Sequence, residues 1–297
     1  MPDAALAPQI SVCVCTYQRA HLLARLLDSL ARQHCGGLVI EIVIVDNDAD
    51  ASAASVVSDF SIRHPGLAIK YVIEAQQGIS FARNRSVASA CGSLVAFIDD
   101  DEEAAPDWLA NLHRCYKQSG ATAVFGPVLP QFPAGSSGWA TRSSLFHRPR
   151  HVTGSLIGCD EARTGNALIA ADWLRRRGTT PFLESLALSG GEDHEFFKWV
   201  EAAGGSFAWA NDACVSELVP VERQRIGFIL ERRLRTSSVY WRSAYADGAR
   251  RPGVEAIKGG RGGIACLLAG LVALPAGLGC AVSWWCKAMN GFGRLLA

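Results

Sequence analysis

The feature that most constrains the fold is residues 94–103, where the apolar run Leu94–Ile98 ends abruptly in five acidic residues. A short, continuous apolar run is typical of a strand buried on both faces of a parallel sheet. In open α/β sheets, ligands gather outside the carboxyl ends of the strands. We therefore expect Asp99, Asp100 and Asp101 to lie at one edge of a sheet and to face a positively charged group.

Three adjacent carboxylates repel one another at neutral pH unless a cation lies among them. Hard oxygen ligands of this kind suit Mg²⁺ or Mn²⁺, which usually keep some water and bridge to substrate phosphates. The acidic run therefore predicts a site for a metal ion and a diphosphate. The alternative is a solvated acidic turn that leads into a helix, whose positive N-terminus carboxylates favour.

Apolar runs and helical patterns alternate along the first hundred residues. Strands are expected at 10–17, 38–45 and 68–73, and helices at 19–33 and 78–91. This alternation predicts an α/β fold with a doubly wound, mostly parallel sheet flanked by helices. The second strand is followed by Asp46, so two strands end in aspartate at the same edge, which favours the functional interpretation of the acidic run.

A second informative stretch is Gly190–Gly191–Glu192–Asp193, which precedes an apolar helical pattern. Paired glycines allow a ligand to approach the backbone closely. One interpretation makes Asp193 a general base above the site. The alternative is a carboxylate that only stabilises the helix N-terminus.

The formal net charge is +1, and 19% of the residues are charged. This balance argues against a nucleic-acid partner, which requires a large basic field.

The C-terminal part differs in composition from the rest of the chain. Residues 246–261 are rich in glycine and predict a linker after a domain at 8–245. Gly262–Cys286 contains no charged residue, and about 20 apolar residues suffice to span a bilayer. We expect 262–297 to be a membrane-associating segment, either a single span or a kinked element. The alternative is a buried helical hairpin.

These motifs together resemble family 2 glycosyltransferases, and the pattern is similar to the succinoglycan-type exopolysaccharide glucosyltransferases. The resemblance covers about residues 10–245. The matching motifs, in order, are Cys15–Thr16–Tyr17–Gln18–Arg19, Val45–Asp46–Asn47, Gly78 with Ala82–Arg83–Asn84, Asp99–Asp100–Asp101, and Gly191–Glu192–Asp193.

The resemblance implies a GT-A fold and an inverting, metal-dependent transfer from a nucleotide diphospho-sugar. It makes Asp193 the catalytic base and Asp101 the ligand of Mn²⁺ or Mg²⁺. The residues that it places at the nucleotide-sugar are Thr16, Tyr17, Arg19, Asp46, Arg83, Asn84, Asp99 and Asp100.

The resemblance also implies a single glucose moved from a UDP-sugar to a polyprenyl-diphosphate-linked glycan. The expected location is the cytoplasmic face of the bacterial inner membrane. The Gln-x-x-Arg-Trp motif of processive synthases is missing, which favours a single addition. Many family members have a metal-binding His where this chain has Ser216 and Glu217, so the third protein ligand is open. The alternatives are a nucleotidyltransferase and a catalytically degenerate subunit of an assembly complex.

Overall fold

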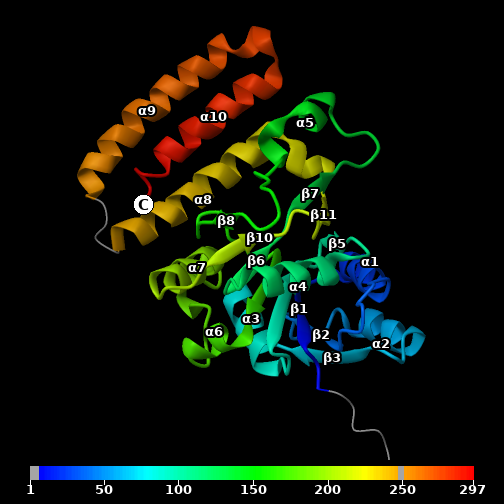
Figure 1. The fold of residues 1–297 in the computed structure, drawn as a ribbon. Coiled ribbons are helices and arrows are strands. Elements are labelled where there is room, and N and C mark those ends of the chain that lie inside the picture. Colours follow the sequence, from blue (N-terminus) through cyan, green and yellow to red (C-terminus); the bar gives the residue numbers. More distant parts are fainter. Residues whose placement is uncertain (1–6, 247–250) are drawn as a thin grey trace, which may run out of the picture. The chain divides into compact units, whose positions relative to one another are not determined.

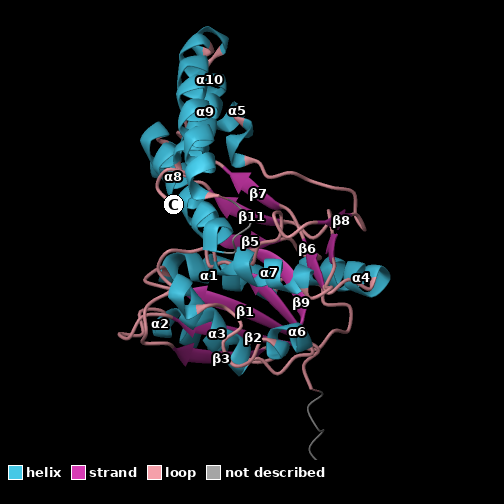
Figure 2. Cartoon of the chain, turned by 90° about the vertical axis from the view of Figure 1, so that its left-hand side faces the viewer, coloured by secondary structure: helices cyan, strands magenta, loops and turns pink. Residues whose placement is uncertain are grey.

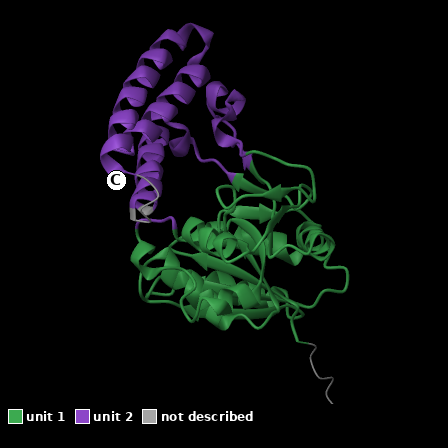
Figure 3. Ribbon diagram, turned by 60° about the vertical axis from the view of Figure 1, so that its left-hand side comes forward, with its two compact units in different colours: residues 1–129, 149–188, 192–217 green, residues 130–148, 189–191, 218–297 purple. Residues whose placement is uncertain are grey.

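The structure is a computed structural model that describes residues 7–246 and 251–297. The chain forms two compact units (Figure 3). One comprises Met1–Leu129, Pro149–Leu188 and Glu192–Glu217, and the other comprises Pro130–Arg148, Ser189–Gly191 and Leu218–Ala297.

An eight-stranded sheet with the order β3-β2-β1-β4-β9-β6-β10-β8 forms the centre of the first unit (Figure 1). β9 and β8 run against their neighbours, and the other six strands share one direction. The prediction of a mostly parallel sheet is therefore confirmed. The strands are β1 (Ile10–Thr16), β2 (Ile40–Asp46), β3 (Ala68–Ile73), β4 (Leu94–Ile98), β6 (Ala123–Phe125), β8 (Leu156–Ile157), β9 (Asn166–Ala170) and β10 (Phe207–Trp209).

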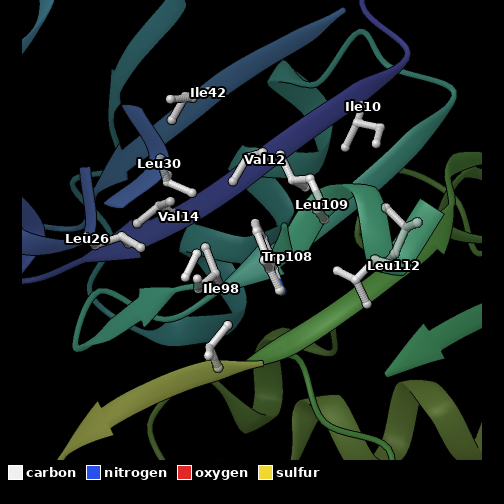
Figure 4. Close-up of a cluster of buried hydrophobic side chains, with 14 of the residues drawn as sticks. Ile10, Val12, Val14, Leu26, Leu30, Ile42, Ile98, Trp108, Leu109 and Leu112 are labelled. Atoms are coloured by element: carbon white, nitrogen blue, oxygen red, sulfur yellow. The ribbon is translucent and has the colours of Figure 1, made fainter. Parts of the chain in front are cut away.

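Helices cover both faces of this sheet, as Figure 2 shows. Successive strand residues point to opposite faces, so Val12 and Val14 lie in one apolar core and Cys13 in the other. The first core, part of which appears in Figure 4, takes side chains from α1 (Ala20–Ala31), α2 (Ala54–Arg63) and α4 (Trp108–Ser119). The second takes side chains from α3 (Ile79–Ser89), α6 (Ala171–Arg176) and α7 (Glu192–Ala202).

A three-stranded sheet, absent from our sequence-based prediction, has the order β5-β11-β7. Its strands are β5 (Glu102–Ala104), β11 (Val215–Leu218) and β7 (Val128–Gln131). β5 directly follows the three aspartates, so the alternative of an acidic turn that leads straight into a helix is wrong. β6 and β7 belong to different sheets, because the chain leaves the large sheet after Phe125.

The second unit contains α8 (Ile226–Ala246), α9 (Pro252–Val272) and α10 (Leu278–Phe292), together with the short helices α5 (Gly138–Arg142) and η1 (Ser144–Phe146). Ile229, Val282 and Cys286 form its small buried core, and Trp139 and Phe146 pack against them. Short 3₁₀ helices complete the chain at η2 (Glu184–Leu186), η3 (Val221–Gln224) and η4 (Leu274–Ala276).

Two predictions about the C-terminal part need correction. α9 begins at Pro252, so most of the expected linker at 246–261 is helical, and 247–250 lie outside the described residues. Among the described residues, no helix is long and apolar enough to cross a membrane, so the single span is wrong. The chain turns back at Leu274–Ala276, where Pro275 interrupts the apolar stretch and α9 ends. The result is a helical hairpin, but not the buried one considered as the alternative, because Ile264, Leu268 and Val272 are exposed.

Candidate functional site

The carboxyl ends of neighbouring parallel strands bring two predicted motifs together. These are the motif Cys15–Arg19 after β1 and the motif Asp99–Asp101 after β4, which we call the acidic motif. In the sheet register Thr16 lies opposite Asp46, and Cys13 lies opposite Phe97. The hydroxyl of Thr16 donates a hydrogen bond of 2.8 Å to Asp100 Oδ2. The acidic motif and the end of β1 therefore meet at one sheet edge, as strand order and the position of ligand sites in α/β sheets predict.

The turn after β4 is held in place by its own backbone. The amide of Asp99 donates to Glu102 Oε2 at 3.0 Å, and the amide of Glu102 donates to the carbonyl of Asp99 at 3.1 Å. Gly165 packs against this turn, since a Cβ there would lie 3.0 Å from both Asp99 Oδ2 and Glu102 Oε1. These contacts thus fix the backbone of the turn that carries the aspartates. Sequence reasoning missed this role of Glu102.

Arg19 contacts two carboxylates of the acidic motif. Its Nη1 donates to Asp100 Oδ1 at 3.2 Å and lies 3.5 Å from Asp101 Oδ2. The Arg19 side chain is 45% exposed, whereas those of Asp100 and Asp101 are 6% and 13% exposed. Burial raises the pKa of Asp100 to about 6, although the Thr16 hydroxyl and the Arg19 charge oppose this shift.

Arg83 joins the acidic motif to the start of α7. Its Nη2 lies 3.6 Å from Asp99 Oδ1, and its Nη1 forms an ion pair with Glu192. Both Arg83 and Glu192 are buried. Burial by itself lowers the pKa of Arg83, but the Glu192 and Asp99 carboxylates outweigh it, and the pKa is raised. Burial also raises the pKa of Glu192, against the effect of Arg83.

Asp193 lies in the first turn of α7, next to this ion pair. Its Oδ1 accepts a hydrogen bond of 2.7 Å from the amide of His194. The charge of Asp193 contributes to the raised pKa of both Arg83 and Glu192, which places it in their neighbourhood. Arg83 therefore links Asp99 of the acidic motif to the helix turn that carries Asp193.

Asp46 differs from the other predicted site residues because its carboxylate is completely buried. Its Oδ2 accepts hydrogen bonds from the Tyr71 hydroxyl at 2.7 Å and the Ala53 amide at 2.8 Å, and its Oδ1 accepts one from the Asp48 amide at 3.2 Å. Burial, and next the bond to Asp46, raise the pKa of Tyr71. Asp46 thus holds the loop after β2, and its contact with a nucleotide stays a prediction.

Asn84 is also engaged within the protein. Its amide nitrogen donates to the carbonyl of Phe182 at 2.8 Å, and its oxygen accepts from the Phe182 amide at 2.9 Å. Asn84 therefore fixes the segment that precedes α7. By contrast, Tyr17 at the end of β1 is 39% exposed, and its contact with a nucleotide remains a prediction.

Ser216 and Glu217, the positions considered for a third metal ligand, lie on β11 beside the acidic motif. Ser216 pairs with Glu103 and Glu217 with Glu102 in the antiparallel register. The Ser216 hydroxyl donates to the carbonyl of Glu103 at 3.5 Å. The segment is thus adjacent to the turn after Asp101.

The donor set can be tested against a divalent metal. In the described ranges 7–246 and 251–297, no group of three or more His, Cys, Asp or Glu residues could hold a metal ion. Mg²⁺ is usually bound through one or two carboxylates together with substrate phosphates, so a full protein cage is not needed. Asp99, whose side chain is 47% exposed, and Asp101 offer hard oxygen atoms of this kind. The residues present fit a metal shared with a diphosphate.

Comparison with known sequences identifies the family. Residues 11–174, more than half of the chain, match the model of "Glycosyl transferase family 2". The chain is also 35% identical over 284 residues to the succinoglycan biosynthesis protein ExoM of Rhizobium meliloti, covering 93% of this chain and 87% of that protein. The chain belongs to glycosyl transferase family 2. It is therefore a transferase, and the predicted family is confirmed.

Other family 2 relatives match over shorter regions. The glucosyl-dolichyl phosphate glucuronosyltransferase of Haloferax volcanii is 30% identical over 160 residues, which cover 53% of this chain and 47% of that protein. The family-model match ends at residue 174, before Asp193.

Solved structures support the GT-A-like fold. The mannosyltransferase PcManGT from Pyrobaculum calidifontis, in complex with GDP-Man and Mn²⁺, has a TM-score of 0.66 at 20% identity, covering 100% of this chain and 88% of that chain. S. aureus TarS 1-349 in complex with UDP-GlcNAc has a TM-score of 0.54 at 17% identity, covering 78% and 66%.

Proposed function

We propose that this family 2 enzyme is an inverting glycosyltransferase that moves a single sugar from a nucleotide diphospho-sugar to a lipid-linked glycan. The observation that carries the proposal is the ion-pair bridge through Arg83. It joins Asp99, in the motif proposed to hold the donor, to Glu192, which directly precedes Asp193. One connected cluster thus contains Asp99 on the side proposed for the donor and Asp193 on the side proposed for the acceptor.

The donor half uses the end of β1 and the acidic motif. We assign Tyr17 and Arg19 to the nucleotide because both lie at the end of β1 and are partly exposed. Asp101, with Asp99, would hold Mn²⁺ or Mg²⁺, which supplies Lewis-acid stabilisation of the charge on the leaving diphosphate. The Mn²⁺ and GDP-Man in PcManGT and the UDP-GlcNAc in TarS support a nucleotide-sugar donor.

The acceptor half uses Asp193 as general base. The acceptor hydroxyl gives its proton to the Asp193 carboxylate while its oxygen attacks the anomeric carbon from the face opposite the diphosphate. The bond from that carbon to the diphosphate oxygen breaks, and its electron pair leaves with the nucleoside diphosphate. One displacement inverts the configuration. Arg83 and Glu192 hold the first turn of α7, so the base keeps its position without a ligand.

The test is Asp193→Asn. A positioned general base typically contributes ~10²–10⁴-fold, so we expect kcat to fall by that factor while the Kd for the donor changes little. The matched control is Asp172→Asn, since Asp172 is a carboxylate in the first turn of α6 with an 83% exposed side chain. Near-normal turnover in Asp193→Asn, or an equal loss in the control, would refute the assignment.

The names of two relatives support a proposal for the acceptor. ExoM is named for succinoglycan biosynthesis, and a second relative is named for a dolichyl phosphate-linked substrate. We therefore propose exopolysaccharide biosynthesis on a polyprenyl-diphosphate-linked glycan at the cytoplasmic face of the bacterial inner membrane, with UDP-glucose as the first donor to test. Donor binding is measured for UDP-glucose, UDP-GlcNAc and GDP-mannose with Mn²⁺ and with EDTA. Equal binding under the two conditions would contradict the shared metal.

A further inference from the structure

The C-terminal hairpin packs through small residues. Gly259 and Gly263 of α9 face Gly291 of α10, since a Cβ at Gly259 would lie 2.3 Å from the Gly291 carbonyl and one at Gly291 would lie 3.1 Å from Gly263. Further along, Gly270 packs against Trp285. Small residues four positions apart at a close helix contact are typical of helices in lipid, where apolar burial does not drive association.

Large apolar side chains lie on the outside of the same hairpin. A hairpin in water would bury such side chains and place polar ones outside. Here large apolar side chains are instead exposed along the last turns of α9 and through the turn into α10, segments that Figure 1 locates. The outward residues, each 36% to 81% exposed, are Ile264, Leu268, Leu271, Val272, Leu274 and Leu278. A contiguous exposed apolar patch marks an interaction surface.

The backbone at the end of the hairpin is compatible with an apolar environment. An irregular turn is costly in lipid if its N–H groups lack partners. Here the amides of Ala273, Ala276 and Gly277 donate to the carbonyls of Ala269, Ala273 and Leu274 at 2.9 to 3.0 Å, and Pro275 has no N–H group. The turn η4 therefore satisfies these amides locally.

The charge of this part of the chain indicates the nature of the surface that it meets. Residues 218–297 contain twelve lysines and arginines and four aspartates and glutamates, a net charge of +8. In the hairpin the acidic residue Glu255 is buried and paired with Lys258 and Arg294. A second copy of so basic a segment would be repelled, whereas an anionic lipid surface would be attracted by about 1 kcal/mol per basic residue near it.

We propose that the α9–α10 hairpin inserts tip-first into one leaflet of an anionic bilayer. Trp285 lies beside Gly270 and donates to the carbonyl of Leu267, and from Leu267 the end of α9 and the turn η4 continue for about 10 Å to the tip, at 1.5 Å per residue. One leaflet contributes about 15 Å of hydrocarbon, so the tip enters the membrane without crossing it. Trp284, 38% exposed, with Lys287 Nζ 4.3 Å from its ring centroid, lies at the interface.

This insertion deepens the proposed function, because a lipid-linked acceptor places the enzyme at a membrane. The vesicle test nevertheless needs neither donor nor acceptor. If the chain does not bind lipid, the assignment of Asp193 as the base is unaffected. If Asp193→Asn keeps near-normal turnover, the result of the vesicle test is unaffected.

The experiment compares the purified full chain with Leu268→Glu/Val272→Glu by co-sedimentation with vesicles. The vesicles are phosphatidylglycerol with phosphatidylethanolamine, or phosphatidylcholine alone. We expect the wild-type chain to prefer the anionic vesicles and the double variant to lose at least a hundredfold in partition coefficient, since each buried Leu or Val contributes at least about tenfold. The single variant Val272→Gln is a milder second test, with an expected loss of about tenfold.

The matched control is Ile62→Glu/Leu156→Glu, since both side chains are apolar and 74% exposed but lie outside the hairpin. It is expected to bind vesicles like the wild type. The proposal is overturned if the double hairpin variant binds vesicles as well as the wild type does, or if the wild type binds neutral and anionic vesicles equally. It is also overturned if the wild type is a dimer that does not bind vesicles and the double hairpin variant is a monomer.

Discussion

Asp100 is buried against the end of β1, and this burial disfavours its charged form. Its side chain is 6% exposed and contacts Thr16 and Arg19, while Asp99 is 47% exposed and Asp101 is turned toward Arg19. Three adjacent aspartates therefore have different physical roles. Asp100 orders the end of β1, whereas Asp99 lies near Arg83 and Asp101 near Arg19.

The raised pKa of Asp100 predicts how stability depends on pH. The folded pKa of about 6 exceeds the ordinary value of 3.8, so between these values the folded state binds more protons and stability falls as pH rises. Asp100→Asn removes this dependence. From pH 4 to pH 7.5 the variant should gain roughly 2 kcal/mol relative to the wild type in the free energy of unfolding. Urea unfolding in EDTA measures the difference, and parallel pH curves would contradict it.

At the scale of elements, the site depends on the contact between α3 and α7. Arg83 and Glu192 are 109 residues apart in the chain, and they are buried where the two helices approach each other below the acidic motif. Asn84, on the same helix, binds both backbone groups of Phe182 in the segment before α7. α3 thus holds the first turn of α7, which carries Asp193, through Arg83, and it holds the segment before α7 through Asn84.

Arg83→Met tests this contact. Removing one partner of a buried ion pair leaves the other charge without compensation, which typically costs about 3–5 kcal/mol. Because the pKa of Glu192 is raised, we expect a smaller loss at acidic pH, where Glu192 is protonated. Arg175→Met is the control, since Arg175 and Asp172 form an exposed pair worth at most about 1 kcal/mol. If both variants lose the same amount of unfolding free energy, the result would contradict a buried, stabilising pair.

At the scale of the whole molecule, charge is distributed unevenly although the chain is almost neutral. Residues 218–297 carry a net charge of +8 and residues 1–217 a net charge of −7, which leaves the total of +1. The acidic part contains the site proposed to hold a cation and a diphosphate. The basic part contains the exposed hairpin. The overall composition hides this division.

A chain that ends at Arg251 tests whether the hairpin is also structural. Without α10, Ile229 and Trp139 lose their cover from Val282 and Cys286. We expect the truncated chain to bind anilinonaphthalene sulfonate strongly and to aggregate, whereas Leu268→Glu/Val272→Glu keeps the fold because those side chains point outward. Fluorescence of the dye compares the two. A well-behaved truncated chain with no added dye binding would show that the hairpin contributes nothing to packing.

The sequence by itself determined the order of strands and helices in the main sheet and the edge at which Asp99–Asp101 lie. Both follow from local properties: continuous apolar runs form buried parallel strands, and their carboxyl ends share one edge. The family motifs were likewise readable in order, and the family was confirmed.

Tertiary structure alone decided which site residues face one another. Asp46 and Asn84 match the same motif pattern as Arg19, yet their polar atoms bond Tyr71 and Phe182 inside the protein, because strand register and helix contacts bring those distant groups to them. Gly259, one of the glycines that suggested a linker, instead allows α9 and α10 to pack closely. Composition is local, whereas burial and pairing depend on which distant segments meet, and only the folded chain specifies that.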